Sequence, residues 1–299
     1  MEETKIDLVI TYVNNNEPVW KNAFIKTCTQ YNYYRKMGSM IGQRFDDIGL
    51  FETNLKLIMK NMPWLNKIYL VVSNKEQVPS YAKKICGDKL KVVMHHEFIY
   101  SQYLPTFNST TIEMFLWNIK GLEEHFIYIN DDMFPVNKLE PSDFYEDNKI
   151  KIDFITDNIE SVKSNQFRKV CINSYVDIAK RVKHSVLANG TYDRPLHSFT
   201  PMIKSNCKKC YQLLGTDITD HLGRFRSDTQ HNQYIYPNYE NLVVGTLKSP
   251  IKFKYLELDF PLEEIKQGIM ENQIVCINDS HNKNGIDIKA IKNMLGEQI

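Results

Sequence analysis

Short apolar runs that alternate with helical patterns constrain the fold of this chain more than any other feature. Four runs have the length and β-branched content of strands buried on both faces: IDLVITYV (6–13), KIYLVVS (67–73), LKVVMHH (90–96) and HFIYIN (125–130). Apolar residues recur at helical spacing between them, within 44–62 and within 109–122. This alternation predicts an α/β fold with a mostly parallel central sheet flanked by helices.

The second half of the chain is less regular and predicts a helical elaboration of that core. Helical patterns cover 166–186 and 201–214, the latter with Thr200 as its N-cap and Gly215 as its terminator. Near the end, QIVCINDS (273–280) repeats the pattern of an apolar strand that runs into polar residues, and IDIKAIKNML (286–295) follows as a closing helix.

Two adjacent carboxylates, Asp131 and Asp132, follow the strand at 125–130 directly after Asn130. Adjacent carboxylates repel each other, so we expect either a bound cation or a catalytic function at this position. Ligands bind outside the carboxyl ends of strands in parallel sheets, and Asn14, just beyond the first strand, should lie at the same edge. We interpret the acidic pair as the mouth of an active site. A turn capped by aspartate side chains is the structural alternative.

Two basic side chains precede predicted helix starts in the second half. His197 lies before the helix capped by Thr200, and Arg226 lies just before Ser227, another candidate N-cap. A basic side chain beside free helix N–H groups suits an anion. Each residue alone is more often a structural histidine or a surface cation, but together they suggest a phosphorylated ligand.

Composition excludes several classes of function. The 37 Lys and Arg residues balance 36 Asp and Glu residues, which gives no reason to expect nucleic acid as a partner. No apolar run approaches the roughly 20 residues of a membrane helix, and the acidic N-terminus is no secretory signal, so we expect a cytoplasmic location. Of the six cysteines only Cys207 and Cys210 form a CxxC pair, and we expect reduced thiols. P-loop, GxGxxG and GxSxG motifs are absent.

Four blocks of the sequence resemble the conserved regions of the Stealth family of hexose-1-phosphate transferases. That family includes bacterial capsular and cell-wall polysaccharide phosphotransferases and the eukaryotic N-acetylglucosamine-1-phosphotransferase. IDLVITYVNNNEPVW (6–20) resembles the first region, and 44–74 with 104–134 resembles the second. HSFTPMIKS with RFRSDTQ is similar to the third region, and CINDS to the fourth.

The resemblance implies a nucleotide-sugar-transferase-like fold that uses a UDP-sugar, most often UDP-N-acetylhexosamine. The sugar-1-phosphate would pass to a hydroxyl of an acceptor glycan, with release of UMP and formation of a phosphodiester in a capsular or cell-wall polysaccharide. We expect one catalytic domain over 1–299, comprising a nucleotide-sugar-binding core (1–139), a helical elaboration with His197 and Arg226 (140–270) and a return strand with a closing helix (271–299). Acceptors of this kind are often lipid-linked, which implies contact with the inner membrane face.

The resemblance also implies functional residues. The catalytic set would be Asp7, Glu113, Asp132, His197, Arg226 and Asp279. The substrate-binding set would be Asn14, Arg44, Asp47, Asn108, Asn130, Asp228 and Asn278. Asp131 and Asp132 would hold Mg²⁺ or Mn²⁺, and His197 would be a general base or a stabiliser of the transferring phosphate.

Two alternatives use the same residues. A metal-dependent glycosyltransferase would attack the anomeric carbon and release UDP instead of UMP. A non-catalytic carbohydrate-binding protein would need a shaped pocket but no convergent acid, base and cation.

Overall fold

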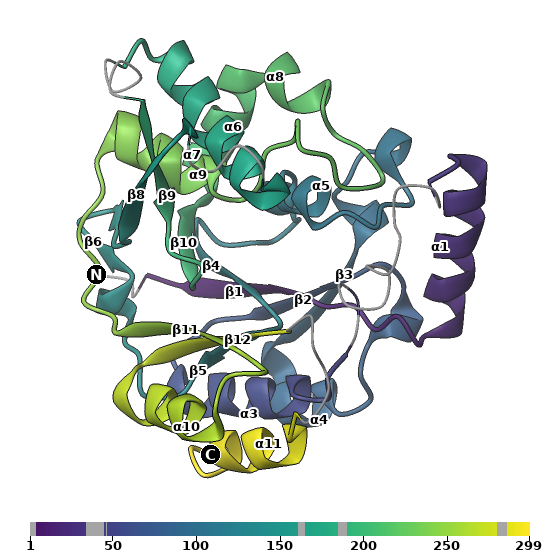
Figure 1. The fold of residues 1–299 in the computed structure, drawn as a ribbon, viewed down its shortest axis with the longest axis vertical. Helices are drawn as coiled ribbons and strands as arrows, with labels where there is room; N and C mark the ends of the chain where they lie inside the picture. Colours follow the sequence, from purple (N-terminus) through teal and green to yellow (C-terminus); the bar gives the residue numbers. More distant parts are fainter. Residues whose placement is uncertain (1–3, 34–44, 46, 161–164, 185–189, 280–285) are drawn as a thin grey trace.

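A five-stranded sheet forms the centre of the protein in the computed structural model, which describes residues 4–33, 45, 47–160, 165–184, 190–279 and 286–299 (Figure 1). The strand order is β10-β4-β1-β2-β3. All neighbouring pairs are parallel except β10 with β4. The strands are β1 (Ile6–Thr11), β2 (Ile68–Val72), β3 (Leu90–Met94), β4 (His125–Asn130) and β10 (Thr200–Ile203). The predicted α/β class with a mostly parallel sheet is confirmed.

The central strands are continuous apolar runs because both of their faces are covered. Along β1, Leu8 and Ile10 pack on one side with Phe51 and Leu55 of α3 (Phe51–Asn61). Val9 points to the other side, into a cluster built from α5 (Ser109–Glu113), α7 (Lys204–Leu214) and α9 (Ile235–Tyr239). Burial on two faces removes the polar alternation that a one-sided strand would show.

A smaller sheet continues the first one. The chain leaves β4, passes Asp131 and Asp132, and enters β5 (Met133–Pro135). β5 pairs antiparallel with β12 (Ile274–Asn278), which pairs parallel with β11 (Phe253–Glu257). Helices α10 (Leu262–Glu271) and α11 (Ile288–Gly296) pack beside this sheet, so the predicted return strand and closing helix are present. The acidic pair therefore lies where the two sheets join.

The remaining elements surround these sheets (Figure 1). In that view α6 (Gln166–Arg181), α7, α8 (Thr216–Thr219) and α9 lie above the central sheet, whereas α3, α10 and α11 lie below it. The other elements are α1 (Pro18–Gln30), α4 (Ala82–Cys86), the π-helix Glu240–Val244, and the two-stranded sheets β6 (Tyr145–Glu146) with β7 (Lys149–Ile150) and β8 (Phe154–Asn158) with β9 (Thr191–Pro195).

The helix start predicted at Thr200 is wrong. Residues Thr200–Ile203 form β10, which pairs antiparallel with β4, and α7 begins only at Lys204. Pro201 suits an edge strand as well as a first helical turn, so the local sequence does not separate the two structures. Gly215 ends α7 with a φ of +44°, as predicted.

Two other predictions about helices also need correction. The helix expected over 109–122 is α5, which stops at Glu113, and its N-cap is Asn108, whose side chain accepts from the backbone N–H of Thr110. Ser227 caps no helix, because the chain is irregular until α9. Neither His197 nor Arg226 thus lies at a helix N-terminus, and the argument for an anion site at such ends fails.

Within the described ranges, the helices are all too short or too polar to cross a lipid bilayer.

Candidate functional site

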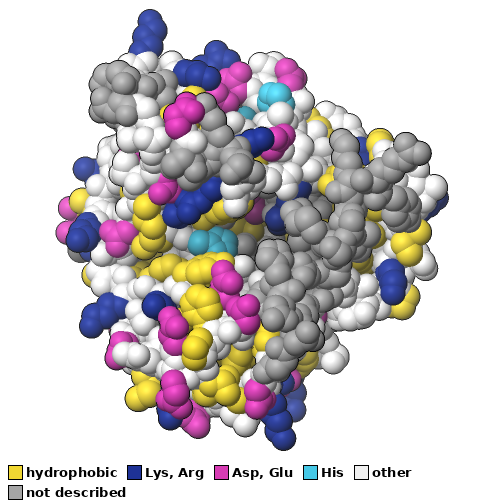
Figure 2. Space-filling model, viewed as in Figure 1, with side chains coloured by type: hydrophobic (Ala, Val, Ile, Leu, Met, Phe, Trp, Pro, Cys, Tyr) yellow, Lys and Arg dark blue, Asp and Glu magenta, His cyan; other side chains and the backbone are white. Residues whose placement is uncertain are grey.

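Three side chains from separate elements converge where β4 and β12 end. Asp132 follows β4, His197 lies in the connection from β9 to β10, and Cys276 belongs to β12. One ligand-type atom of each lies within 4.8 Å of the others. On the face shown in Figure 2, a histidine near the centre has basic side chains above it and hydrophobic and acidic ones below. This cluster is the centre of the candidate site.

The carboxylate of Asp132 has one engaged and one free oxygen. The thiol of Cys276 donates to Oδ2 over 3.5 Å, and burial raises the pKa of that thiol well above its usual value. The protonated thiol therefore donates a hydrogen bond to the Asp132 carboxylate. Among the described residues, Oδ1 of Asp132 has no hydrogen-bond partner although it is buried. A buried, unpaired carboxylate oxygen suits a cation.

Asp131 and Asn130 add two further side chains with oxygen atoms that can coordinate a metal ion. Burial, the adjacent Asp132 carboxylate and Asp47 together raise the pKa of Asp131 to about 8. The carbonyl Oδ1 of Asn130 is also buried and, within the described part of the chain, has no hydrogen-bond partner. Oxygen ligands of this kind are those that Mg²⁺ and Mn²⁺ prefer. The residues present thus fit the predicted divalent metal.

His197 is held by a tyrosine that the sequence did not mark. Its Nδ1 lies 3.0 Å from the hydroxyl of Tyr234. Burial lowers the pKa of His197, Asp132 opposes this effect, and the guanidinium groups of Arg194 and Arg226 reinforce it. A neutral imidazole is therefore favoured near pH 7, with Nε2 available to a substrate hydroxyl.

Arg226 lies in an irregular loop that α5 holds in place. Its Nη2 donates to the hydroxyl of Ser109 over 2.8 Å. Asn108, which is fully buried, donates from Nδ2 to the carbonyls of Gly223 and Phe225 at 3.2 and 3.1 Å. Asn108 therefore positions the Arg226 loop.

Glu113 binds the backbone near the C-terminal end of the same loop. Its Oε2 accepts from the backbone N–H of Gln233 over 2.9 Å. Burial raises the pKa of Glu113, and the charge of Arg226 works against that rise. The charge of Arg226 thus acts on both Glu113 and His197.

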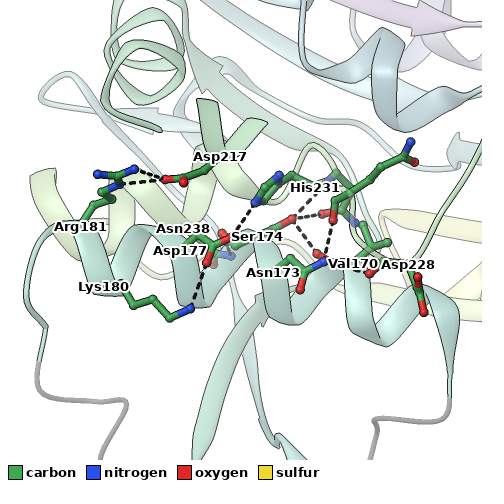
Figure 3. A network of polar contacts seen from close by, with 12 residues as sticks. Val170, Asn173, Ser174, Asp177, Lys180, Arg181, Asp217, Asp228, His231 and Asn238 are labelled. Atoms are coloured by element: carbon green, nitrogen blue, oxygen red, sulfur yellow. Dashed lines mark hydrogen bonds and ion pairs between the residues drawn. The ribbon is translucent and has the colours of Figure 1, made fainter. Parts of the chain in front are cut away.

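Helix α6 holds the loop from the other side (Figure 3). His231 Nε2 lies 3.0 Å from Asp177 Oδ2, and Asn173 donates to the carbonyls of Asp228 and Gln230, each at 3.0 Å. The carboxylate of Asp228 pairs with Lys169 at 2.8 Å on this exposed surface. Asp228 therefore faces α6, not the cluster around His197.

Asn278 and Asp279 lie at the carboxyl end of β12. The backbone N–H of Ile277 donates to the carbonyl of Asp132 over 2.9 Å, which brings the end of this strand beside the acidic pair. Asn278 Nδ2 donates to the hydroxyl of Tyr255 over 2.8 Å. Asp279 follows directly and is half-buried. The sequence-predicted edge is thus shared by residues from β4 and β12.

A separate pocket of about 330 Å³ opens near the carboxyl ends of β1 and β2. Asp47 accepts a hydrogen bond of 2.6 Å from the hydroxyl of Tyr12, and Gln77 holds the backbone of Asn14. The pocket is lined by Tyr12, Asn14, Asn16, Glu17, Asp47, Glu76, Gln77, Val78, Pro79, Ser80 and Tyr81, with no lysine or arginine among them. Arg44 lies outside the described residues.

Asp7 is far from this edge in the fold. It lies at the amino end of β1, is fully buried, and accepts hydrogen bonds from Asn66 Nδ2, Lys67 N and Glu123 N at 2.8, 3.0 and 2.8 Å. These donors belong to the connections that precede β2 and β4. The structure therefore does not bring Asp7 together with the other predicted catalytic residues.

Three residues of the site, Arg194, Tyr234 and Cys276, carry no motif that marks them in the sequence. Arg194 precedes His197 by three residues on β9, and its Nε donates to Asp157 Oδ2 over 2.7 Å. Arg168 of α6 binds the same carboxylate oxygen. One carboxylate thus faces two cations, which leaves positive charge beside His197. Their roles depend on contacts between segments that are distant in the sequence. The one sequence signal is that Cys276 begins the block CINDS.

Comparison with known proteins agrees with the sequence resemblance. Residues 44–153 match the family model described as Stealth protein CR2, conserved region 2. The capsular polysaccharide phosphotransferase LcbA of Aeromonas hydrophila is 29% identical over 310 residues, which cover 97% of this chain and 83% of that protein. The receptor polysaccharide phosphotransferase WefC of Streptococcus oralis is 31% identical over 207 residues, covering 67% of this chain and 60% of that protein.

Among solved structures, the galactosyltransferase LgtC in complex with donor and acceptor sugar analogs superposes with a TM-score of 0.45 at 9% identity, covering 97% of this chain and 95% of that chain. The matched family region holds Asp47, Asn108 and Glu113 together with Asn130, Asp131 and Asp132. The resemblance predicted from the sequence is therefore confirmed: the chain carries the second conserved region of the Stealth proteins.

Proposed function

We propose that this protein transfers a hexose-1-phosphate, with N-acetylhexosamine-1-phosphate as the first candidate, from a UDP-sugar to a hydroxyl of a capsular or cell-wall glycan. The observation that carries the proposal is the convergence of the Asp132 carboxylate and the His197 imidazole within 4.8 Å, with the charges of Arg226 and Arg194 acting on His197. The similarity to proteins named capsular and receptor polysaccharide phosphotransferases supports the class of reaction.

In the proposed step, an acceptor oxygen attacks the phosphorus bonded to the donor sugar. The bond from that phosphorus to the bridging oxygen of UMP breaks, and the acceptor proton passes to Nε2 of His197. The hydrogen bond to Tyr234 orients the ring for this transfer. A neutral imidazole of lowered pKa can accept the proton near neutral pH. Phosphodiester and UMP are the products.

Arg226 and Arg194 bind the phosphate oxygens in this proposal. Guanidinium groups form paired, charge-assisted hydrogen bonds with phosphate. Asp157 holds Arg194 and also pairs with Arg168, while Ser109 holds Arg226. Preorganised cations stabilise the charge that develops on a transferring phosphoryl group. We assign Glu113 and Asn108 to positioning the Arg226 loop.

Asp131 and Asp132 would hold a divalent metal with help from Asn130 and Asp279. When bound, Mg²⁺ or Mn²⁺ neutralises charge on the donor diphosphate. The unpaired Oδ1 of Asp132 and the raised pKa of Asp131 are the observations that favour a cation here. Asp7 has no part in this proposal, and we assign it a structural role.

The nucleoside of the donor would occupy the pocket near β1 and β2. The described residues that line this pocket offer aromatic, amide and carboxylate side chains but no lysine or arginine, which suits an uncharged base and ribose better than phosphate. Burial raises the pKa values of its residues Tyr12 and Tyr81, and the nearby Asp131 carboxylate adds to this rise. A nucleotide could therefore extend from the pocket to the acidic pair, with Asn14 and Asp47 as ligands of the nucleoside.

The leaving nucleotide tests the proposal. The purified protein is incubated with UDP-N-acetylglucosamine, Mn²⁺ or Mg²⁺ and a panel of bacterial oligosaccharides, and UMP is resolved from UDP by chromatography. UMP together with a phosphodiester product is the expected result. Release of UDP would instead identify a glycosyltransferase, and binding without release of either nucleotide from a panel of UDP-sugars would identify a carbohydrate-binding protein.

A further inference from the structure

Two exposed aromatic side chains lie against the ring of His197. The ring centroids of Phe167 and Tyr255 are each 6.3 Å from that of His197, at interplanar angles of 76° and 58°. Phe167 belongs to the first turn of α6, and Tyr255 lies in the middle of β11. Because α6 lies above the site and β11 below it in Figure 1, the two rings flank His197 from different elements.

Phe167 and Tyr255 are among the few aromatic side chains of the described residues that are exposed to solvent. Phe167 is 45% and Tyr255 is 37% exposed. Among the described residues only four phenylalanine, tyrosine or tryptophan side chains are exposed to this degree, the other two being Tyr31 and Tyr100. Single exposed apolar residues need no explanation, but apolar surface gathered around polar groups often marks a ligand-binding groove. Here two of four such rings surround one histidine.

Both rings are fixed in position but left uncovered. The hydroxyl of Tyr255 accepts a hydrogen bond of 2.8 Å from Asn278. The ring of Phe167 packs edge-on against Tyr234 at 6.2 Å and 75°, and Tyr234 itself holds His197. The orientation of each aromatic face is thus coupled to the imidazole. A rigid aromatic face at a reactive group can hold a ligand at a small cost in conformational entropy.

We propose that Phe167 and Tyr255 form the platform that binds the acceptor sugar beside His197. A pyranose ring has a C–H face that packs on an aromatic ring and hydroxyls at its rim that accept and donate hydrogen bonds. Packing of that face on Phe167 or Tyr255 leaves a rim hydroxyl toward the imidazole. The assignment to the acceptor rests on the proposed function, in which the donor nucleoside occupies the pocket near β1 and β2.

Binding to an array of defined bacterial capsular and cell-wall oligosaccharides tests the platform without turnover. The full-length protein is compared with Phe167→Ala, Tyr255→Ala and Tyr255→Phe. We expect the wild-type protein to select one or more oligosaccharides, and each alanine variant to bind them at least tenfold more weakly. Tyr255→Phe keeps the aromatic face and should lose less than Tyr255→Ala. Tyr100→Ala is the matched control, because Tyr100 is 49% exposed and packs on Phe115 away from His197.

The outcomes separate this inference from the proposed reaction. Equal binding by wild type and both alanine variants, or no binding by the wild type to any oligosaccharide, would overturn the platform. Release of UMP from UDP-N-acetylglucosamine is measured on the same samples and judges the reaction by itself. An alanine variant that shows no thermal transition has not folded and is set aside. The other alanine variant then decides the result, together with the binding affinity of Tyr255→Phe relative to that of the wild type.

Discussion

The hydroxyl of Tyr234 lies 3.0 Å from Nδ1 of His197, although the two residues come from different segments of the second half of the chain. This contact engages Nδ1 of a ring that lies beside Asp132. Tyr234→Phe removes the hydroxyl and keeps the ring volume, so we expect kcat to fall about tenfold, as the loss of one hydrogen bond predicts. His197→Ala should abolish turnover. Steady-state UMP release checks both, and an unchanged kcat in Tyr234→Phe would remove the tyrosine from the mechanism.

The rate should depend on pH through His197. Burial disfavours the charged imidazolium, so its pKa lies below the ordinary value of a histidine. A histidine that acts as a general base must be neutral, and activity is therefore lost as the pH falls through this lowered pKa, not as it rises. We expect kcat/KM to be level between about pH 6.5 and 7.5 and to decline on the acid side. The profile is measured at saturating Mg²⁺, which keeps Asp131 ionised, and an acid limb with its midpoint above pH 7 would then contradict the assignment.

The sequence was sufficient for the central sheet and for the acidic edge. Runs such as 6–13 and 125–130 are mostly apolar because two layers cover β1 and β4, and Asn130, Asp131 and Asp132 follow at the carboxyl edge of the sheet. The strand β10 could not be predicted in the same way. Its residues carry a plausible helix start, and only pairing with β4 selects the extended form.

Contacts across long stretches of chain explain what else the sequence did not reveal. Cys276 and Asp132 are 144 residues apart, and Asn108 reaches Phe225 across 117 residues. The loop with Arg226 is irregular because side chains of α5 and α6, not its own backbone, satisfy its polar groups. Such partners leave no periodic signal in the sequence.

Asp131→Asn should stabilise the metal-free protein while removing activity. With a pKa near 8, the carboxyl group favours the folded state fully only below its ordinary pKa, and that contribution is lost as the pH rises toward 8. In EDTA at pH 8 the variant should therefore melt several degrees higher than wild type, and this advantage should shrink by pH 5.

Added Mg²⁺ or Mn²⁺ gives the complementary result. The cation should raise the Tm of the wild-type protein and restore UMP release after EDTA treatment, whereas the Tm of Asp131→Asn should respond little. Differential scanning fluorimetry across pH and metal concentration provides the measurement. Full activity in EDTA, or identical metal responses of the two proteins, would show that Asp131 does not hold a metal.

Arg194→Gln should weaken the binding of phosphate without affecting the nucleoside. Hydrogen bonds to charged groups contribute about 1.5–3 kcal/mol, so UDP should bind roughly tenfold to a hundredfold more weakly, while uridine binds equally well. The matched control is Arg181→Gln, because Arg181 also pairs with an aspartate, at 2.8 Å (Figure 3), but is 48% exposed and is not among the arginines whose charge acts on His197. Titration calorimetry with UDP and uridine decides the point. Equal losses for the two ligands would indicate a structural role for Arg194.

Asp7→Ala tests whether Asp7 is catalytic, as the sequence resemblance implies, or structural, as its position in the fold indicates. Three donors from the connections before β2 and β4 converge on this fully buried carboxyl group at the amino end of β1. Removing their acceptor leaves buried donors unpaired, so we expect a loss of about 1–3 kcal/mol in the free energy of unfolding. The KM for the donor and kcat per folded molecule should stay within twofold of wild type. The Asp7 carboxyl group lies at the amino end of β1, whereas Asp132 lies beyond the carboxyl end of the neighbouring parallel strand β4. Urea unfolding and initial rates below the unfolding transition provide the two measurements. A variant that keeps its stability but loses turnover would restore Asp7 to the catalytic set and would require the amino end of β1 to contact the substrate.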